Sequence, residues 1–131
     1  DLKKFRDRGG KLLLYHGWND TGIAPENTVH YYSGVLKTLG PGQDGWLRLF
    51  MMPGVGHCSG GVGPSQANFM SAMERWREAG QAPDEITAYR VSGNRVDRTR
   101  PLCPYPKVAR YRGIGSINDA ANFVCEEPKK N

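Results

Sequence analysis

The chain of 131 residues is 38% hydrophobic, which is enough apolar material for the modest core of one globular domain. No segment approaches the roughly 18 consecutive apolar residues that a membrane span requires, so we exclude a membrane protein. The net charge of +5 does not predict nucleic-acid binding, because the basic residues are scattered and their one denser stretch, residues 95–112, contains prolines typical of looped surface.

The first predicted elements are a strand and a helix. Residues 11–16 form a short apolar run that ends at Gly17, which is typical of a strand buried on both faces. From residue 27 to residue 39 the apolar side chains recur near helical spacing. Pro25 precedes this segment and Gly40 follows it, so both ends of the helix are marked.

A second strand and a second helix follow in the same order. Residues 46–52 are mostly apolar and predict a buried strand, whereas the segment 54–63 has five glycines in ten residues and predicts a loop. Between residues 69 and 79 the apolar side chains are spaced along one face of a helix, which ends at Gly80.

The rest of the chain contains less regular signals. Residues 86–91 alternate enough for a strand, and beyond them we expect an irregular, proline-rich tail with a short helix near residues 118–123. The order strand, helix, strand, helix predicts parallel strands with crossover helices, which is the α/β class. Because two or three strands do not complete such a sheet, we expect the chain to be part of a longer protein.

Polar residues cluster directly after the two buried strands. Asp20 follows the first strand and His57 follows the second, at the carboxyl ends where open α/β sheets hold their sites. A serine hydrolase needs an imidazole base whose tautomer is fixed by a carboxylate, and in α/β hydrolases the acid precedes the base along the chain. The spacing alone leaves a second interpretation open, in which Asp20 is a surface residue and His57 lies in a turn.

Metal and nucleotide sites are less well supported. His16, His57 and Cys58 could ligate zinc, but no close pair such as Cys-x-x-Cys accompanies them. The glycines after the second strand do not complete a dinucleotide fingerprint, since position 59 is serine. We therefore expect no cofactor to bind within this chain.

Four separated segments resemble, in order, the signatures of the tannase and feruloyl esterase family. They are RGGKLLLYHGWND at 8–20, PGVGHCSGG at 53–61, RPLCPYP at 100–106 and INDAANFVC at 117–125. Members of that family are α/β hydrolases with a large inserted lid, and they cleave esters of aromatic acids such as gallic or ferulic acid. The resemblance implies that residues 1–131 are the C-terminal segment of one α/β-hydrolase catalytic domain.

The resemblance also implies roles for individual residues. It makes Asp20 the triad acid and His57 the base, and it places Cys58 where the family has a cysteine bridged to one beside the nucleophilic serine. No Gly-x-Ser-x-Gly occurs in the chain. The nucleophile, the oxyanion donors and a lid with a calcium site would then belong to a preceding N-terminal half, and this chain alone would be inactive.

Three cysteines leave three possible pairings open on the residues alone. The resemblance selects Cys103 with Cys125, which leaves Cys58 unpaired or linked to another chain. It also implies a secreted or periplasmic protein, where disulfides persist. The alternative hypothesis is a catalytically inactive, truncated fragment that associates with itself, as a homodimer through an exposed strand edge or through Cys58.

Overall fold

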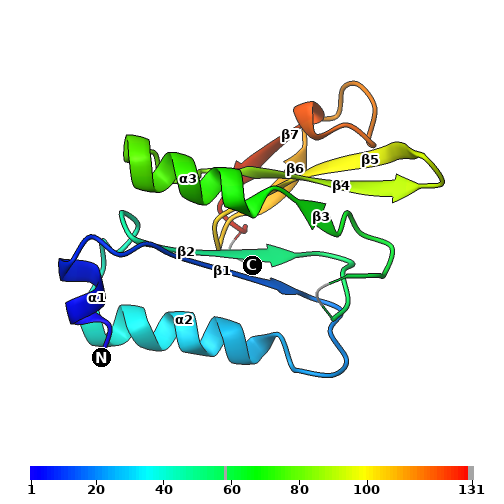
Figure 1. Cartoon of the computed structure of the whole chain (residues 1–131). Helices are drawn as coiled ribbons and strands as arrows, with labels where there is room; N and C mark the ends of the chain where they lie inside the picture. Colours follow the sequence, from blue (N-terminus) through cyan, green and yellow to red (C-terminus); the bar gives the residue numbers. More distant parts are fainter. Residues whose placement is uncertain (58, 130–131) are drawn as a thin grey trace.

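The computed structural model describes residues 1–57 and 59–129 (Figure 1). Along the chain lie α1 (Lys3–Asp7), β1 (Leu12–Gly17), α2 (Glu26–Leu39), β2 (Leu47–Met52), β3 (Gln66–Ala67), α3 (Phe69–Ala79), β4 (Ile86–Ser92), β5 (Arg95–Leu102), β6 (Val108–Tyr111), a 3-10 turn η1 (Ala120–Asn122) and β7 (Phe123–Glu126). None of the described helices is long and apolar enough to cross a membrane.

Two parallel strands, β1 and β2, form the central layer. They pair in register from Leu12 opposite Leu47 to Gly17 opposite Met52. Helix α2 covers one face of the pair, and α3 with the antiparallel strands covers the other (Figure 1). The predicted α/β arrangement of two parallel strands with a crossover helix is confirmed.

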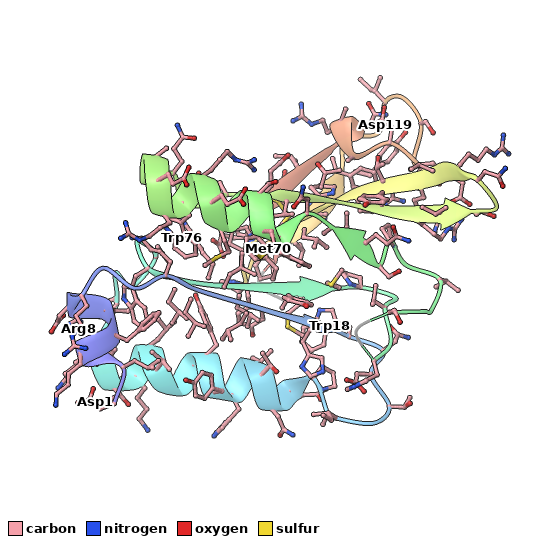
Figure 2. All side chains as sticks on the ribbon, viewed as in Figure 1. Asp1, Arg8, Trp18, Met70, Trp76 and Asp119 are labelled. Atoms are coloured by element: carbon pink, nitrogen blue, oxygen red, sulfur yellow. A yellow bond between two sulfur atoms is a disulfide. The ribbon has the colours of Figure 1, made fainter. Side chains whose placement is uncertain are left out.

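The apolar core lies on both faces of β2, as expected for a strand without a solvent-exposed face. Leu47, Leu49 and Met51 pack on the α2 side, whereas Phe50 and Met52 pack on the opposite side against α3, β4 and β5. On that second side Trp76, which is completely buried, projects from α3 toward the central strands (Figure 2). Its indole nitrogen donates a hydrogen bond to the carbonyl of Gly45 at 3.2 Å.

The tail is more regular than predicted, because it contains the three antiparallel strands β5, β6 and β7. β5 pairs with β4, which in turn pairs with β3, and β6 pairs with β7. The expected helix near residues 118–123 is only the short η1 turn, after which the chain becomes extended from Phe123. Helix α1 was not predicted, since its five residues are too few to show a helical period.

The basic side chains of the tail are largely engaged within this part of the fold. Arg110 donates to Glu126 at 2.7 Å across the β6–β7 pair, and the guanidinium of Arg100 lies 4.1 Å from the ring centre of Phe123. Both arginines lie on strands rather than in the looped surface that the prolines suggested. Through these contacts the two arginines connect neighbouring strands of the tail.

The tail is tied to the central layer and to itself. The Tyr105 amide donates to the carbonyl of Leu49 at 2.7 Å, so the tail covers the edge of β2 that faces away from β1. A disulfide joins Cys103, just beyond β5, to Cys125 in β7, with Cα atoms 5.5 Å apart. This is the pairing that the family resemblance implies, and it holds the β6–β7 hairpin against β5.

Removing the disulfide by the double substitution Cys103→Ser and Cys125→Ser should lower the free energy of unfolding by about 3 kcal/mol, because the bridge closes a loop of roughly 20 residues in the unfolded chain. Urea unfolding of the two proteins under non-reducing conditions measures the difference. The wild-type protein in reductant is the control and should lose a similar amount. Equal midpoints for the oxidised wild type and the double variant would contradict this role.

Candidate functional site

The site forms where the loops after β1 and β2 meet. The amide of Trp18 donates to the carbonyl of Met52 at 3.0 Å, and the amide of Asn19 donates to Val55 at 2.9 Å, so the hydrogen bonding of the strand pair continues into both loops. A Cβ atom on Gly17 would overlap the carbonyl oxygen of Val55. Glycine at this position therefore lets the two loops approach closely enough for their side chains to meet.

The loop that carries His57 is folded back on itself and anchored from outside. Val55 and Gly61 form an isolated antiparallel bridge, and Gly61 has a φ of +86°, which favours glycine. Arg90 of β4 donates to the carbonyl of Val62 at 3.0 Å and also binds Asp97 through two nitrogens, at 2.8 and 2.7 Å. The β4–β5 hairpin thus holds the far end of the loop.

Asp20 is the centre of the site, and its carboxylate accepts four hydrogen bonds. Oδ1 accepts from the backbone amides of Gly22 and Ile23, at 2.8 and 2.9 Å. Oδ2 accepts from His57 Nδ1 at 2.7 Å and from His16 Nε2 at 2.9 Å. The side chain of Asp20 is only 1% exposed, so these four groups replace the water that would otherwise solvate the charge.

These contacts hold the pKa of the Asp20 carboxyl well below its usual range. The largest cause is the hydrogen bond from the Ile23 amide, and the bonds from His57, His16 and Gly22 act in the same direction. Burial raises the pKa but does not offset them. Asp20 is therefore a carboxylate at neutral pH, and it accepts a hydrogen bond from Nδ1–H of His57.

The two imidazoles that contact Asp20 differ in exposure. The His16 side chain is 13% exposed, whereas that of His57 is 58% exposed. Within the described residues, Nε2 of His57 has no hydrogen-bond partner. With Nδ1 held by Asp20, this ring presents its second nitrogen to whatever approaches from outside the chain.

The structure brings the predicted pair Asp20 and His57 into direct contact, although their positions are separated by 37 residues. Cys58 lies outside the described residues. Sequence reasoning missed the part played by His16, which it considered only as a zinc ligand or as a histidine at a strand end. The available signal was its position four residues before Asp20, directly before the turn.

The structure also shows the surroundings of Trp18 and bears on the zinc site considered from the sequence. Trp18 lies near the ends of the central strands (Figure 2) and lines a cavity of about 430 Å³, whose described lining includes Met51 and Tyr105 but neither Asp20 nor His57. Residues 1–57 and 59–129 contain no group of three or more His, Cys, Asp or Glu arranged to hold a metal ion.

Comparisons with known proteins identify the family of the chain. The model of the family described as "Tannase and feruloyl esterase" matches residues 1–126. The chain belongs to the tannase and feruloyl esterase family. A relative within it is the mono(2-hydroxyethyl) terephthalate hydrolase of Piscinibacter sakaiensis, which is 46% identical over 98% of this chain and 22% of its own length.

Solved structures of family members share the fold. The crystal structure of feruloyl esterase B from Aspergillus oryzae superposes with a TM-score of 0.88 at 34% identity, over 96% of this chain and 28% of that one. Tannin acyl hydrolase from Aspergillus niger gives a TM-score of 0.77 at 26% identity, over 98% and 24% of the two chains. The α/β-hydrolase fold is thereby established, and the chain spans about a quarter of the length of these relatives.

The lowered pKa of Asp20 predicts how Asp20→Asn alters stability with pH. A carboxyl whose folded pKa is depressed contributes stability above its unfolded pKa of about 3.9, and this stability is lost as the pH falls toward the folded pKa. The substitution should therefore destabilise this family member most above about pH 5, and the difference should shrink below about pH 4.

Urea unfolding of wild type and Asp20→Asn at several pH values measures this trend. Asp119→Asn, at the N-cap of the η1 turn, is the control for the general effect of removing a carboxylate. A difference in unfolding free energy that stays constant from pH 7 to pH 3 would show that the Asp20 contacts do not favour its charged form.

Proposed function

We propose that this chain is the C-terminal part of a serine carboxylic-ester hydrolase that acts on esters of aromatic acids, with Asp20 as the triad acid and His57 as the base. The observation that carries the proposal is the 2.7 Å hydrogen bond from His57 Nδ1 to a buried, charged Asp20. The His57 side chain is 58% exposed, and its opposite ring nitrogen has no hydrogen-bond partner within the described residues. This is the arrangement that a serine hydroxyl needs in a base.

The proposed reaction uses His57 in every proton transfer. A serine oxygen attacks the ester carbonyl while Nε2 takes the hydroxyl proton, and the resulting imidazolium is stabilised by the Asp20 carboxylate, which stays ionised. The same proton then passes to the alcohol oxygen as the carbon–oxygen bond breaks, leaving an acyl-enzyme. Water attacks this ester with His57 again as base, which releases the acid and restores the serine.

The serine must come from outside this chain. No Gly-x-Ser-x-Gly is present, so the nucleophile, the oxyanion donors and the lid would belong to a preceding half of the same protein. Within the described residues β1 pairs only with β2, which leaves its other edge available for the next strand of a larger sheet. Cys58, next to His57, is proposed to bridge to a cysteine near that serine.

The substrate class rests on the relatives. The three proteins compared above are a mono(2-hydroxyethyl) terephthalate hydrolase, a feruloyl esterase and a tannin acyl hydrolase. What their substrates share is an ester of an aromatic acid, which favours this class for the present protein. The Cys103–Cys125 disulfide supports a secreted or periplasmic location, because such bonds persist in oxidising compartments.

In the full-length protein, His57→Ala should lower kcat by on the order of 10⁴ or more, because the base takes part in both acylation and deacylation. Asp20→Asn should lower kcat by roughly 10³ to 10⁴ with little change in KM, since it removes the charge and favours the wrong imidazole tautomer. The double variant should lose scarcely more than His57→Ala alone. Steady-state hydrolysis of an aryl-acid ester such as methyl ferulate provides the measurement.

The matched control is His30→Ala, which removes an exposed histidine of α2 outside the site and should leave kcat unchanged. If Asp20→Asn keeps kcat within about tenfold of wild type, Asp20 is not the triad acid. A small effect of His57→Ala on kcat would contradict the proposed mechanism.

The chain of 131 residues on its own should hydrolyse such esters no faster than the buffer blank, because an acid–base pair without a serine has nothing to activate. The same assay with the purified chain tests this. Turnover that disappears in His57→Ala would reveal a nucleophile within the chain, with Ser59 as the first residue to substitute.

A further inference from the structure

The carboxylate oxygen that contacts His57 also contacts a second imidazole, which the proposed triad does not use. His16 Nε2 lies 2.9 Å from Asp20 Oδ2, and its Nδ1 lies 2.6 Å from Thr28 Oγ1 in the first turn of α2. His16 is thus held at both ring nitrogens. A largely buried imidazole needs a partner at each nitrogen, so what sets His16 apart is that one of its partners is the carboxylate that also binds His57.

The chemistry of the two partners determines where the proton of His16 lies. Ionised Asp20 only accepts hydrogen bonds, so Nε2 of His16 must carry a hydrogen. A neutral imidazole has one N–H, which leaves Nδ1 with a lone pair that accepts from the hydroxyl of Thr28. In a neutral His16 ring the hydrogen bonds therefore run in one direction, from Thr28 through His16 to Asp20.

We propose that His16 is a positioning residue, whose ring is held in place by Thr28 and whose Nε2–H locks the Asp20 carboxylate toward His57. This inference rests on the proposed function, because it assigns His16 a task in the same acid–base pair. The amides of Gly22 and Ile23 hold Oδ1 only. Rotation about the Cβ–Cγ bond of Asp20 would move Oδ2 out of line with His57, and the donor from His16 opposes that rotation.

A neutral donor suits this place better than a cation. When His57 takes the serine proton it becomes an imidazolium, and a second positive charge on the same carboxylate oxygen would compete with it for the negative charge of Asp20. Neutral His16 supplies a hydrogen bond without that competition. Its 13% exposure keeps water from replacing the bond, whereas the more exposed His57 ring depends on Asp20 for its orientation.

The test compares His16→Phe, which keeps a planar ring and loses both nitrogens, with His16→Gln, whose amide can place an N–H near the former Nε2. Both are made in the full-length protein and assayed with methyl ferulate, with rates expressed per folded enzyme. His16→Phe should lower kcat by about 10- to 100-fold with KM within about threefold, which is the range for losing one bond to a charged group. His16→Gln should recover kcat to within about tenfold of wild type.

Thr28→Val tests whether Thr28 holds the His16 ring, because it removes the hydroxyl and keeps the shape. In the wild-type background it should lower kcat by about three- to tenfold, since the His16 ring then has no partner at Nδ1 and turns more freely away from Asp20. In the His16→Gln background it should change kcat by less than about twofold, because the imidazole that Thr28 holds is already absent. A purely structural role for Thr28 would give the same effect in both backgrounds.

Matched controls come from the same helix. His30→Phe changes an exposed histidine of α2, and Thr38→Val removes a hydroxyl that bonds the carbonyl of Gly34 at 2.8 Å; both should leave kcat unchanged. His57→Ala is measured in the same series. If it abolishes turnover while His16→Phe stays within about threefold of wild type, the inference about His16 is overturned and the proposed function stands.

Two further outcomes also decide the matter. Equal losses for His16→Phe and His16→Gln, or equal effects of Thr28→Val in the two backgrounds, would show that the hydrogen bond to Asp20 does not carry the effect. Activity retained in His57→Ala would overturn the proposed function and the role of His16 with it. If His16→Phe does not fold, His16→Gln and Thr28→Val still give the comparison.

Discussion

The buried carboxylate of Asp20 is the feature on which the site depends. An ionised carboxyl removed from water is costly unless donors replace its hydration, and here four donors do so. They come from the end of β1, from the turn after it and from the loop after β2. His16 is in turn hydrogen-bonded to Thr28 at the start of α2. The Asp20 carboxylate therefore links four segments of the chain through hydrogen bonds.

The scaffold makes this arrangement possible through the backbone. The parallel pairing of β1 and β2 ends with Gly17 opposite Met52, so both loops leave the sheet at the same level. The absence of a side chain at Gly17 lets the loops touch, and Arg90 restrains the outer part of the loop that carries His57. The hairpin of β4 and β5, which contributes no group to the acid–base pair, therefore acts on it through the carbonyl of Val62.

Sequence reasoning could place Asp20 and His57 because each follows the end of a buried strand, and the carboxyl ends of parallel strands share one edge. It could not place His16 on Asp20, because that contact depends on how tightly the turn between them closes. Nor could it recognise β5 (Arg95–Leu102), whose residues are mostly polar. This strand is defined by its pairing with β4 and by the ion pair of Asp97 with β4, neither of which leaves a periodic pattern.

Asp20 and His57 differ in how much of their surroundings this chain provides. The Asp20 side chain is almost fully buried and accepts four hydrogen bonds from this chain. The His57 side chain, in contrast, remains 58% exposed. Charge–charge attraction between an imidazolium and a carboxylate weakens as solvent gains access, so an exposed base gains little from even a well-held acid. If a preceding half brings the serine, as proposed, it must therefore also cover His57 and supply low-dielectric surroundings as well as a nucleophile.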